Sequence, residues 1–196
     1  KVGDRVFVNH HVGRLSGHRA LRGHFTRDPF YSKTGLDPGT MCEYFRAPAV
    51  NLQTDTHILP ENISFAAATV LEPWGCVAGG LKVAGIQPGD TVAVVGCGFM
   101  GQGFVHMAPL FGAGQIIALD FSQYRLDKAT EMGATSVVNP SNEDAFEKVK
   151  DLTDGHMADV VIVTVPNVKA WEQGYSLVGV GGTLHLNAPP PGEQSW

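Results

Sequence analysis

The stretch Thr91-Val-Ala-Val-Val-Gly-Cys-Gly-Phe-Met-Gly101 decides the fold. Its first five residues form an unbroken, mostly β-branched apolar run, which is typical of a buried strand. Gly96, Gly98 and Gly101 follow at the spacing of a tight turn that leads into a helix. A strand, a three-glycine turn and a helix in this order predict the first unit of a parallel α/β sheet.

Apolar runs continue to alternate with helical patterns after this stretch. The expected strands are 91–96, 116–120, 136–138, 159–163 and 183–186, and the expected helices are 99–112, 123–132, 143–152 and 168–178. Near-continuously apolar strands that alternate with helices predict a parallel sheet covered on both faces. We therefore expect a doubly wound α/β domain of the Rossmann type, with Pro109 distorting the last turn of its first helix.

Residues 1–57 follow a different pattern. Short strand-like runs at Arg5–Val8 and Cys42–Ala47 are separated by a polar stretch with frequent Gly and Pro, which indicates a small irregular β domain. Ser64 is then expected to cap an Ala-rich helix, in which Pro73 marks a kink or a new helix start. The predicted domains are therefore 1–57 and 58–196.

Composition narrows the class of protein. Of the 196 residues, 43% are hydrophobic and 17% are charged, which is typical of a soluble globular protein. A net charge of -5 argues against a nucleic-acid partner, and no apolar run reaches the roughly 20 residues that span a bilayer. Three cysteines with no short pair spacing favour a reducing cytoplasm. Because the chain begins at Lys1 inside a strand approach and ends after a Pro-rich loop, we expect truncation at both ends, with the last strand missing.

The glycine turn also suggests chemistry. Gly98, without a Cβ, lets the backbone approach a pyrophosphate, which the N-terminus of the following helix attracts. Asp120 lies 19 residues past Gly101, close to the spacing at which dinucleotide-binding folds place a ribose-binding acid. A carboxylate there accepts hydrogen bonds from both ribose hydroxyls and repels a 2′-phosphate, which predicts NAD in preference to NADP. Two alternatives stay open: an ordinary glycine-rich turn, and an Asp120 that only caps the next helix at Ser122.

Several short motifs occur in a fixed order along the chain. They are Gly3-Asp-Arg-Val6, Gly39-Thr-Met-Cys-Glu-Tyr44, Leu71-Glu-Pro-Trp74, Gln87-Pro-Gly-Asp-Thr-Val92 and the glycine turn. The succession resembles the medium-chain, zinc-dependent alcohol and polyol dehydrogenases, in the sorbitol/iditol and threonine dehydrogenase-like branch. The resemblance implies part of a GroES-like domain at 1–57, an NAD-binding domain at 58–196 and a homo-oligomer. It also implies hydride transfer between a secondary alcohol or polyol and NAD, assisted by zinc.

The resemblance assigns roles to individual residues. Glu72, 24 positions before Gly96, matches the acid on the catalytic-zinc side, and the remaining zinc ligands would precede Lys1. Arg125 matches a residue near the adenosine end of NAD, and Met100 would offer its backbone N–H to the pyrophosphate. Residues 164–165 and 187–188 would lie beside the nicotinamide. Glu72 could instead be a helix-start acid and Arg125 a solvated surface residue, and no residue can be assigned as the proton acceptor.

The chain departs from the family at its structural zinc lobe. Arg14, Gly17, Ala20 and Asp28 stand at the four cysteine positions, so no structural zinc is expected. An Arg14–Asp28 ion pair could replace the metal. The neighbouring histidines have no ligand spacing and are expected to be solvated: His10, His11, His18 and His24.

Some side-chain roles stay general. Cys76 and Cys97 are expected to be buried packing residues, and Phe25, Phe30 and Trp74 could belong to substrate-lining loops. Two other functions remain open, a zinc-free reductase of the quinone or enoyl type and a non-catalytic dinucleotide-binding protein. Glu72 and Asp120 argue against the zinc-free reductase, whereas the lost zinc lobe keeps the non-catalytic reading open.

Overall fold

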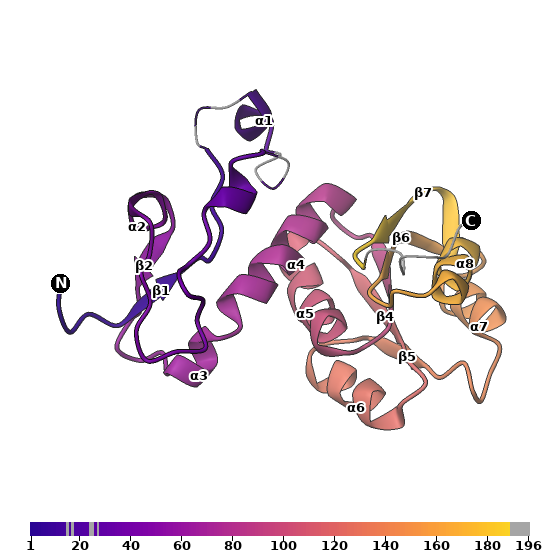
Figure 1. Cartoon of the computed structure of the whole chain (residues 1–196). Helices are drawn as coiled ribbons and strands as arrows, with labels where there is room; N and C mark the ends of the chain where they lie inside the picture. The colour runs from indigo at the N-terminus through magenta and orange to yellow at the C-terminus, as the bar shows by residue number, and fades with distance from the viewer. Residues whose placement is uncertain (15, 17, 24–25, 27, 189–196) are drawn as a thin grey trace. The chain divides into compact units, whose positions relative to one another are not determined.

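The computed structural model describes residues 1–14, 16, 18–23, 26 and 28–188. Gly17, His24 and Phe25, for which the sequence analysis has expectations, lie outside the described residues. The chain forms two compact units, Lys1–Glu72 and Pro73–Trp196 (Figure 1). The assignment of 1–57 and 58–196 to two domains stays a prediction.

The first unit is built from short elements. They are β1 (Val6–Val8), α1 (His18–Leu21), η2 (Tyr31–Lys33), α2 (Ala49–Thr54), β2 (Thr56–Ile58) and α3 (Phe65–Ala68). β1 and β2 pair antiparallel, with Phe7 opposite His57. Neither α2 nor β2 is among the elements expected from the sequence.

A buried asparagine organises the interior of the first unit. Asn51 is fully buried in α2, and its amide donates to the carbonyl oxygens of Asn9 at 2.9 Å and Thr34 at 3.0 Å. The Thr34 hydroxyl in turn accepts the backbone N–H of Val12 at 2.8 Å. Side-chain bonds to buried backbone groups therefore hold together loops that contain little regular structure.

The strand expected at Cys42–Ala47 is wrong. This segment has bends at residues 42 and 43, and its only ladder pairing in the described chain is an isolated bridge between Asp37 and Arg46. Arg46 also forms an exposed ion pair with Asp37 at 2.9 Å. Met41 and Tyr44 are exposed, so the apolar residues that suggested a strand do not pack against a sheet.

The second unit is an α/β domain with a five-stranded sheet. Its elements are α4 (Leu71–Ala84), β3 (Thr91–Val95), α5 (Phe99–Met107), η3 (Ala108–Phe111), β4 (Gln115–Leu119), α6 (Gln123–Glu131), β5 (Ser136–Val138), α7 (Ala145–Leu152), β6 (Ala158–Val163), α8 (Val168–Ser176) and β7 (Val178–Leu186). All strand pairs are parallel, in the order β5-β4-β3-β6-β7. The doubly wound Rossmann fold is therefore confirmed, and the strand order reverses between β3 and β6.

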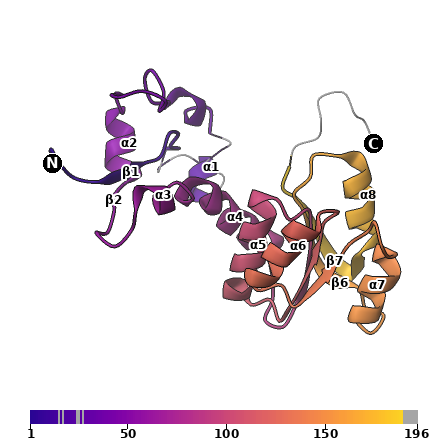
Figure 2. The same ribbon diagram turned by 90° about the horizontal axis from the view of Figure 1, so that it is seen from below.

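Successive residues of each strand serve opposite faces of this sheet. Val92 and Val94 of β3 pack into the cluster that contains residues of α4, α5 and α6. Ala93 and Val95 pack into a second cluster with residues of α7 and α8. Figure 2 shows α5 and α6 on one side of the sheet and α7 and α8 on the other. Burial on both faces explains why β3 is apolar without interruption from Val92 to Val95.

Three local expectations about helix ends are confirmed. The Ser64 hydroxyl accepts the N–H of Ala67 at 3.0 Å and caps α3. Pro73 lies in the first turn of a new helix, α4, where a missing N–H removes no intrahelical bond. Pro109 falls at the start of η3, which continues α5 as a 3₁₀ turn.

Across the described ranges, no helix has the length and apolar character needed to cross a bilayer.

Candidate functional site

The turn after β3 contains three glycines. At two of them a side chain would clash with neighbouring protein atoms, and at the third the space beside the backbone is empty. Gly96 has φ +90°, and a Cβ there would lie 2.4 Å from Val165 Cγ2. A Cβ on Gly101 would lie 1.9 Å from the carbonyl oxygen of Gly96. A Cβ on Gly98 would meet no atom within 4 Å. The protein interior therefore requires Gly96 and Gly101, whereas Gly98 leaves open space in front of the turn.

The N-terminus of α5 borders this open space. α5 has nine residues, its N-cap is Gly98, and no side chain caps it. The first described backbone bond of the helix runs from Gln102 N–H to Gly98 O at 2.9 Å, so the N–H groups of residues 99–101 have no partner within the helix. These donors and the helix dipole attract an anion. The side chain of Met100 packs against the core, as expected.

Asp120 ties the end of β4 to the glycine turn. The residue is 9% exposed, and its carboxylate accepts the N–H of Cys97 and the N–H of Ser122, each at 2.8 Å. Arg125 Nη1 lies 3.6 Å from Asp120 Oδ2. The contact with Ser122 that the sequence left as an alternative is present, and the bond to Cys97 accompanies it. Arg125 is therefore an ion-pair partner of Asp120, not solely a solvated side chain.

Two further side chains hold the turn in place. The Gln102 amide donates to Cys97 O at 2.9 Å and to Arg125 O at 2.8 Å, and so links the turn to α6. The Thr164 hydroxyl donates to Gly96 O at 2.8 Å. The sequence analysis missed Gln102, whose only signal is its position directly after the last glycine of the turn. Thr164, expected beside a nicotinamide, contacts the turn.

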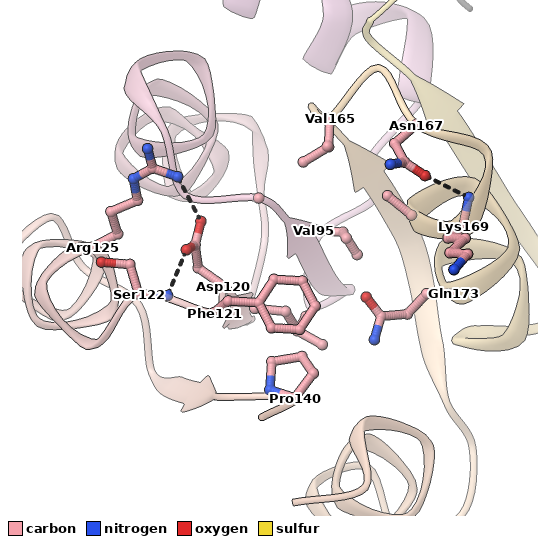
Figure 3. Close-up of a pocket in the computed structure, with 13 residues that line it drawn as sticks. Val95, Asp120, Phe121, Ser122, Arg125, Pro140, Val165, Asn167, Lys169 and Gln173 are labelled. Carbon is pink, nitrogen blue, oxygen red and sulfur yellow. Dashed lines mark hydrogen bonds and ion pairs between the residues drawn. The ribbon is translucent and has the colours of Figure 1, made fainter. Parts of the chain in front are cut away.

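A cavity of about 720 Å³ opens at the carboxyl ends of β3, β4 and β6 (Figure 3). It lies where the strand order reverses, which is the usual place for a ligand in an open α/β sheet. The cavity wall includes four residues predicted from the sequence to contact the cofactor: Gly96, Asp120, Arg125 and Val165. Gly98, Met100 and Gly101 belong to the adjoining start of α5.

Four other residues of the wall were not predicted from the sequence. Phe121 and Pro140 contribute apolar surface, and Lys169 and Gln173 contribute polar groups from α8. Their only sequence signal is that they follow the second, third and fourth strands of the sheet in chain order. Asn167, also in the wall, caps α8 by accepting the N–H of Lys169 at 2.8 Å.

Glu72 is not among the residues of the cavity wall. Glu72 is in the first turn of α4 and belongs to the first compact unit. Among the residues that the structure describes, no three His, Cys, Asp or Glu side chains are grouped so that they could hold a metal ion. The described residues therefore do not fit a complete zinc site.

Two expectations about neighbouring side chains are wrong. Cys76 is exposed on α4, not buried as a packing residue. Arg14 lies over the ring of Phe30 at 4.9 Å, whereas Asp28 accepts the N–H of Phe30. No ion pair joins Arg14 to Asp28, both of which are described.

Cys97 is buried, as expected. Its side chain is 1% exposed, and burial, with the nearby charge of Asp120, raises the pKa of the thiol to about 12. A raised pKa favours the neutral thiol in the folded state. Its contribution to stability is present below the ordinary thiol pKa and is lost as the pH rises from about 9 to about 12.

Gly101→Ala should destabilise the second unit, because the new Cβ would clash with the backbone oxygen of Gly96. We expect a loss of about 3 kcal/mol or more in the free energy of unfolding, measured by urea denaturation. Gly98→Ala is the matched control, since its φ of -68° suits alanine and its Cβ has open space. Its change should stay below about 1 kcal/mol, and equal losses in the two variants would contradict this account of the turn.

Cys97 should resist alkylation by iodoacetamide at pH 8, because the thiolate is the reactive form and both burial and the raised pKa suppress it. Peptide mass spectrometry should find the exposed Cys42 labelled first, and Cys97 labelled only after denaturation. Rapid labelling of Cys97 in the folded protein would show that the glycine turn opens readily.

Comparison with known proteins places this geometry in a family. Residues 100–195 match the family model described as "Zinc-binding dehydrogenase". The chain is 32% identical to a sorbitol dehydrogenase of Bacillus subtilis over 97% of its own length and 53% of that protein. It is 32% identical to an L-threonine 3-dehydrogenase of Pyrococcus furiosus over 100% of its own length and 55% of that protein.

The fold has a close match among solved structures. An oxidoreductase/dehydrogenase of unknown specificity from Escherichia coli superposes with a TM-score of 0.85 and 25% identity, over 98% of this chain and 55% of that one. The chain spans about half the length of the curated relatives that it matches. Together with the glycine turn and Asp120, these matches show that the chain is similar to zinc-binding dehydrogenases of the medium-chain alcohol and polyol type.

Proposed function

We propose that the chain binds NAD and serves an oxidoreductase that transfers a hydride between a secondary alcohol or polyol and this cofactor, with zinc assistance. One observation carries the proposal. The open face of the glycine turn and the Asp120 carboxylate border one cavity, at the point where the strand order reverses. A bound NAD would supply the hydride-accepting nicotinamide.

The residues of the turn fit the phosphates of a dinucleotide. The space in front of Gly98, which a Cβ would fill, lets the pyrophosphate approach the backbone. The uncapped start of α5, including the N–H of Met100, would donate hydrogen bonds to the phosphate oxygens. The positive end of the helix dipole adds attraction for the negative charge.

Asp120 fits the adjoining ribose. Each of its two carboxylate oxygens accepts one backbone N–H, and an ionised carboxylate has about four acceptor positions, so both oxygens can still accept a ribose hydroxyl. Arg125 compensates the buried negative charge and holds the carboxylate in place at the adenosine end. A 2′-phosphate would bring further negative charge against this carboxylate, which supports NAD over NADP.

The substrate class rests on the relatives. Their names specify sorbitol and L-threonine, both of which carry a secondary hydroxyl group. Glu72 is the proposed acid on the zinc side. The described residues do not form a complete zinc site by themselves.

The assembly and location of the protein are also proposals. The free thiols of Cys42 and Cys97 support a reducing compartment, and we propose the cytoplasm. A homo-oligomer is proposed from the family resemblance.

Calorimetric titration of the chain with NAD and NADP tests the cofactor. NAD should bind at least about tenfold more tightly, because like-charge repulsion from Asp120 exceeds about 1.4 kcal/mol for the 2′-phosphate. Gly98→Ala, which should remain folded, should lose NAD binding because its methyl group occupies the pyrophosphate space. Equal or tighter binding of NADP would remove the role proposed for Asp120.

Zinc binding tests Glu72. In protein that also contains the zinc ligands expected before Lys1, Glu72→Ala should weaken zinc affinity about 10-fold or more, measured by competition with a chromogenic chelator. Glu61→Ala is the matched control, because Glu61 is an exposed acid of the same compact unit. Equal zinc affinity in the two variants would exclude Glu72 from the metal site.

A further inference from the structure

We propose that Gln173 reads the hydrogen-bonding edge of the adenine base and that Phe121 supplies the surface on which this base stacks. The inference rests on the proposed function, because it takes the cavity to hold the adenosine half of a dinucleotide. Recognition of the adenine base would then come from a residue of α8, whereas the glycine turn would hold the phosphates.

The order of the wall residues places the base. Gly96 and Asp120 both line the cavity, and in the proposed complex the phosphates lie at Gly96 and the ribose at Asp120. A base attached to that ribose extends past Asp120 to the next residue, Phe121. The Phe121 side chain is 70% exposed, although it is a large apolar group. Figure 3 shows its ring projecting across the cavity, with Pro140 beside it. Aromatic rings exposed in this way provide a stacking surface for a planar base.

Gln173 faces this ring from the opposite wall. Its side chain leaves α8 and points its amide into the cavity toward Phe121 (Figure 3). Within the described ranges, its side-chain amide has no hydrogen-bond partner, and only its backbone carbonyl is used, by Ser176. A donor and an acceptor are therefore both available on the cavity side.

The chemistry of the amide matches adenine. A glutamine amide can accept a hydrogen bond from the N6 amino group of adenine while donating to an adjacent ring nitrogen. A bidentate pair of this kind contributes discrimination of about tenfold or more in affinity between the matching base and one without this pattern. The neighbouring wall residues Val165 and Ala170 offer no such groups.

The test compares NAD with its 1,N6-ethenoadenine analogue, in which the added ring removes the N6 donor and blocks N1. Wild-type chain should bind the analogue about tenfold more weakly than NAD in fluorescence or calorimetric titrations. Gln173→Leu should weaken NAD about tenfold and leave the analogue unchanged. Gln123→Leu, an exposed glutamine on α6 outside the cavity wall, is the matched control and should change neither affinity.

The outcomes separate this inference from the proposed function. Equal binding of NAD and the analogue by wild-type chain, or an equal loss of both in Gln173→Leu, would overturn the role of Gln173 and leave NAD binding in place. Failure of the wild-type chain to bind either ligand would overturn the proposed function as well. If Gln173→Leu unfolds, Gln173→Glu replaces it. This variant keeps the side-chain length and should also lose the preference for NAD, because a carboxylate cannot donate to the ring nitrogen.

Discussion

The close approach of α5 to the turn after β3 is the contact on which the candidate site depends. With no Cβ on Gly101, the helix can lie directly against the carbonyl of Gly96. Any side chain at Gly101 would push the helix start away from the sheet. The same contact aims the uncapped N-terminus of α5 at the open space in front of Gly98. Packing and anion attraction are thus two consequences of one backbone geometry.

Asp120 joins this turn to the neighbouring strand. A buried carboxylate is costly unless it is hydrogen-bonded and its charge is compensated, and here two backbone N–H groups and Arg125 do both. The arrangement makes the acid a structural tie as well as a candidate ribose ligand. Replacing it would therefore disturb the turn in addition to any loss of cofactor contact, and the two effects need separate measurements of folding and binding.

Local patterns predicted the second unit well and the first unit poorly. In the second unit, strands buried on both faces leave a continuous apolar signal, and Pro109 marks the end of α5. The first unit is held largely by side-chain bonds from residues such as Asn51, which leave no periodic signal. The short run Cys42–Ala47 resembled a strand, but a strand forms only where another strand pairs with it.

The sequence alone determined the glycine spacing, the acid after the second strand of the sheet and the family motifs, because each is a short-range pattern set by backbone geometry. The tertiary structure decided which side chains, distant in the sequence, lie together in the wall of the cavity. It placed Gln173 opposite Phe121, bonded Gln102 to both sides of the turn and left Cys76 exposed. Those relations join residues far apart in the chain, and they depend on how helices pack against the sheet, which no local periodicity encodes.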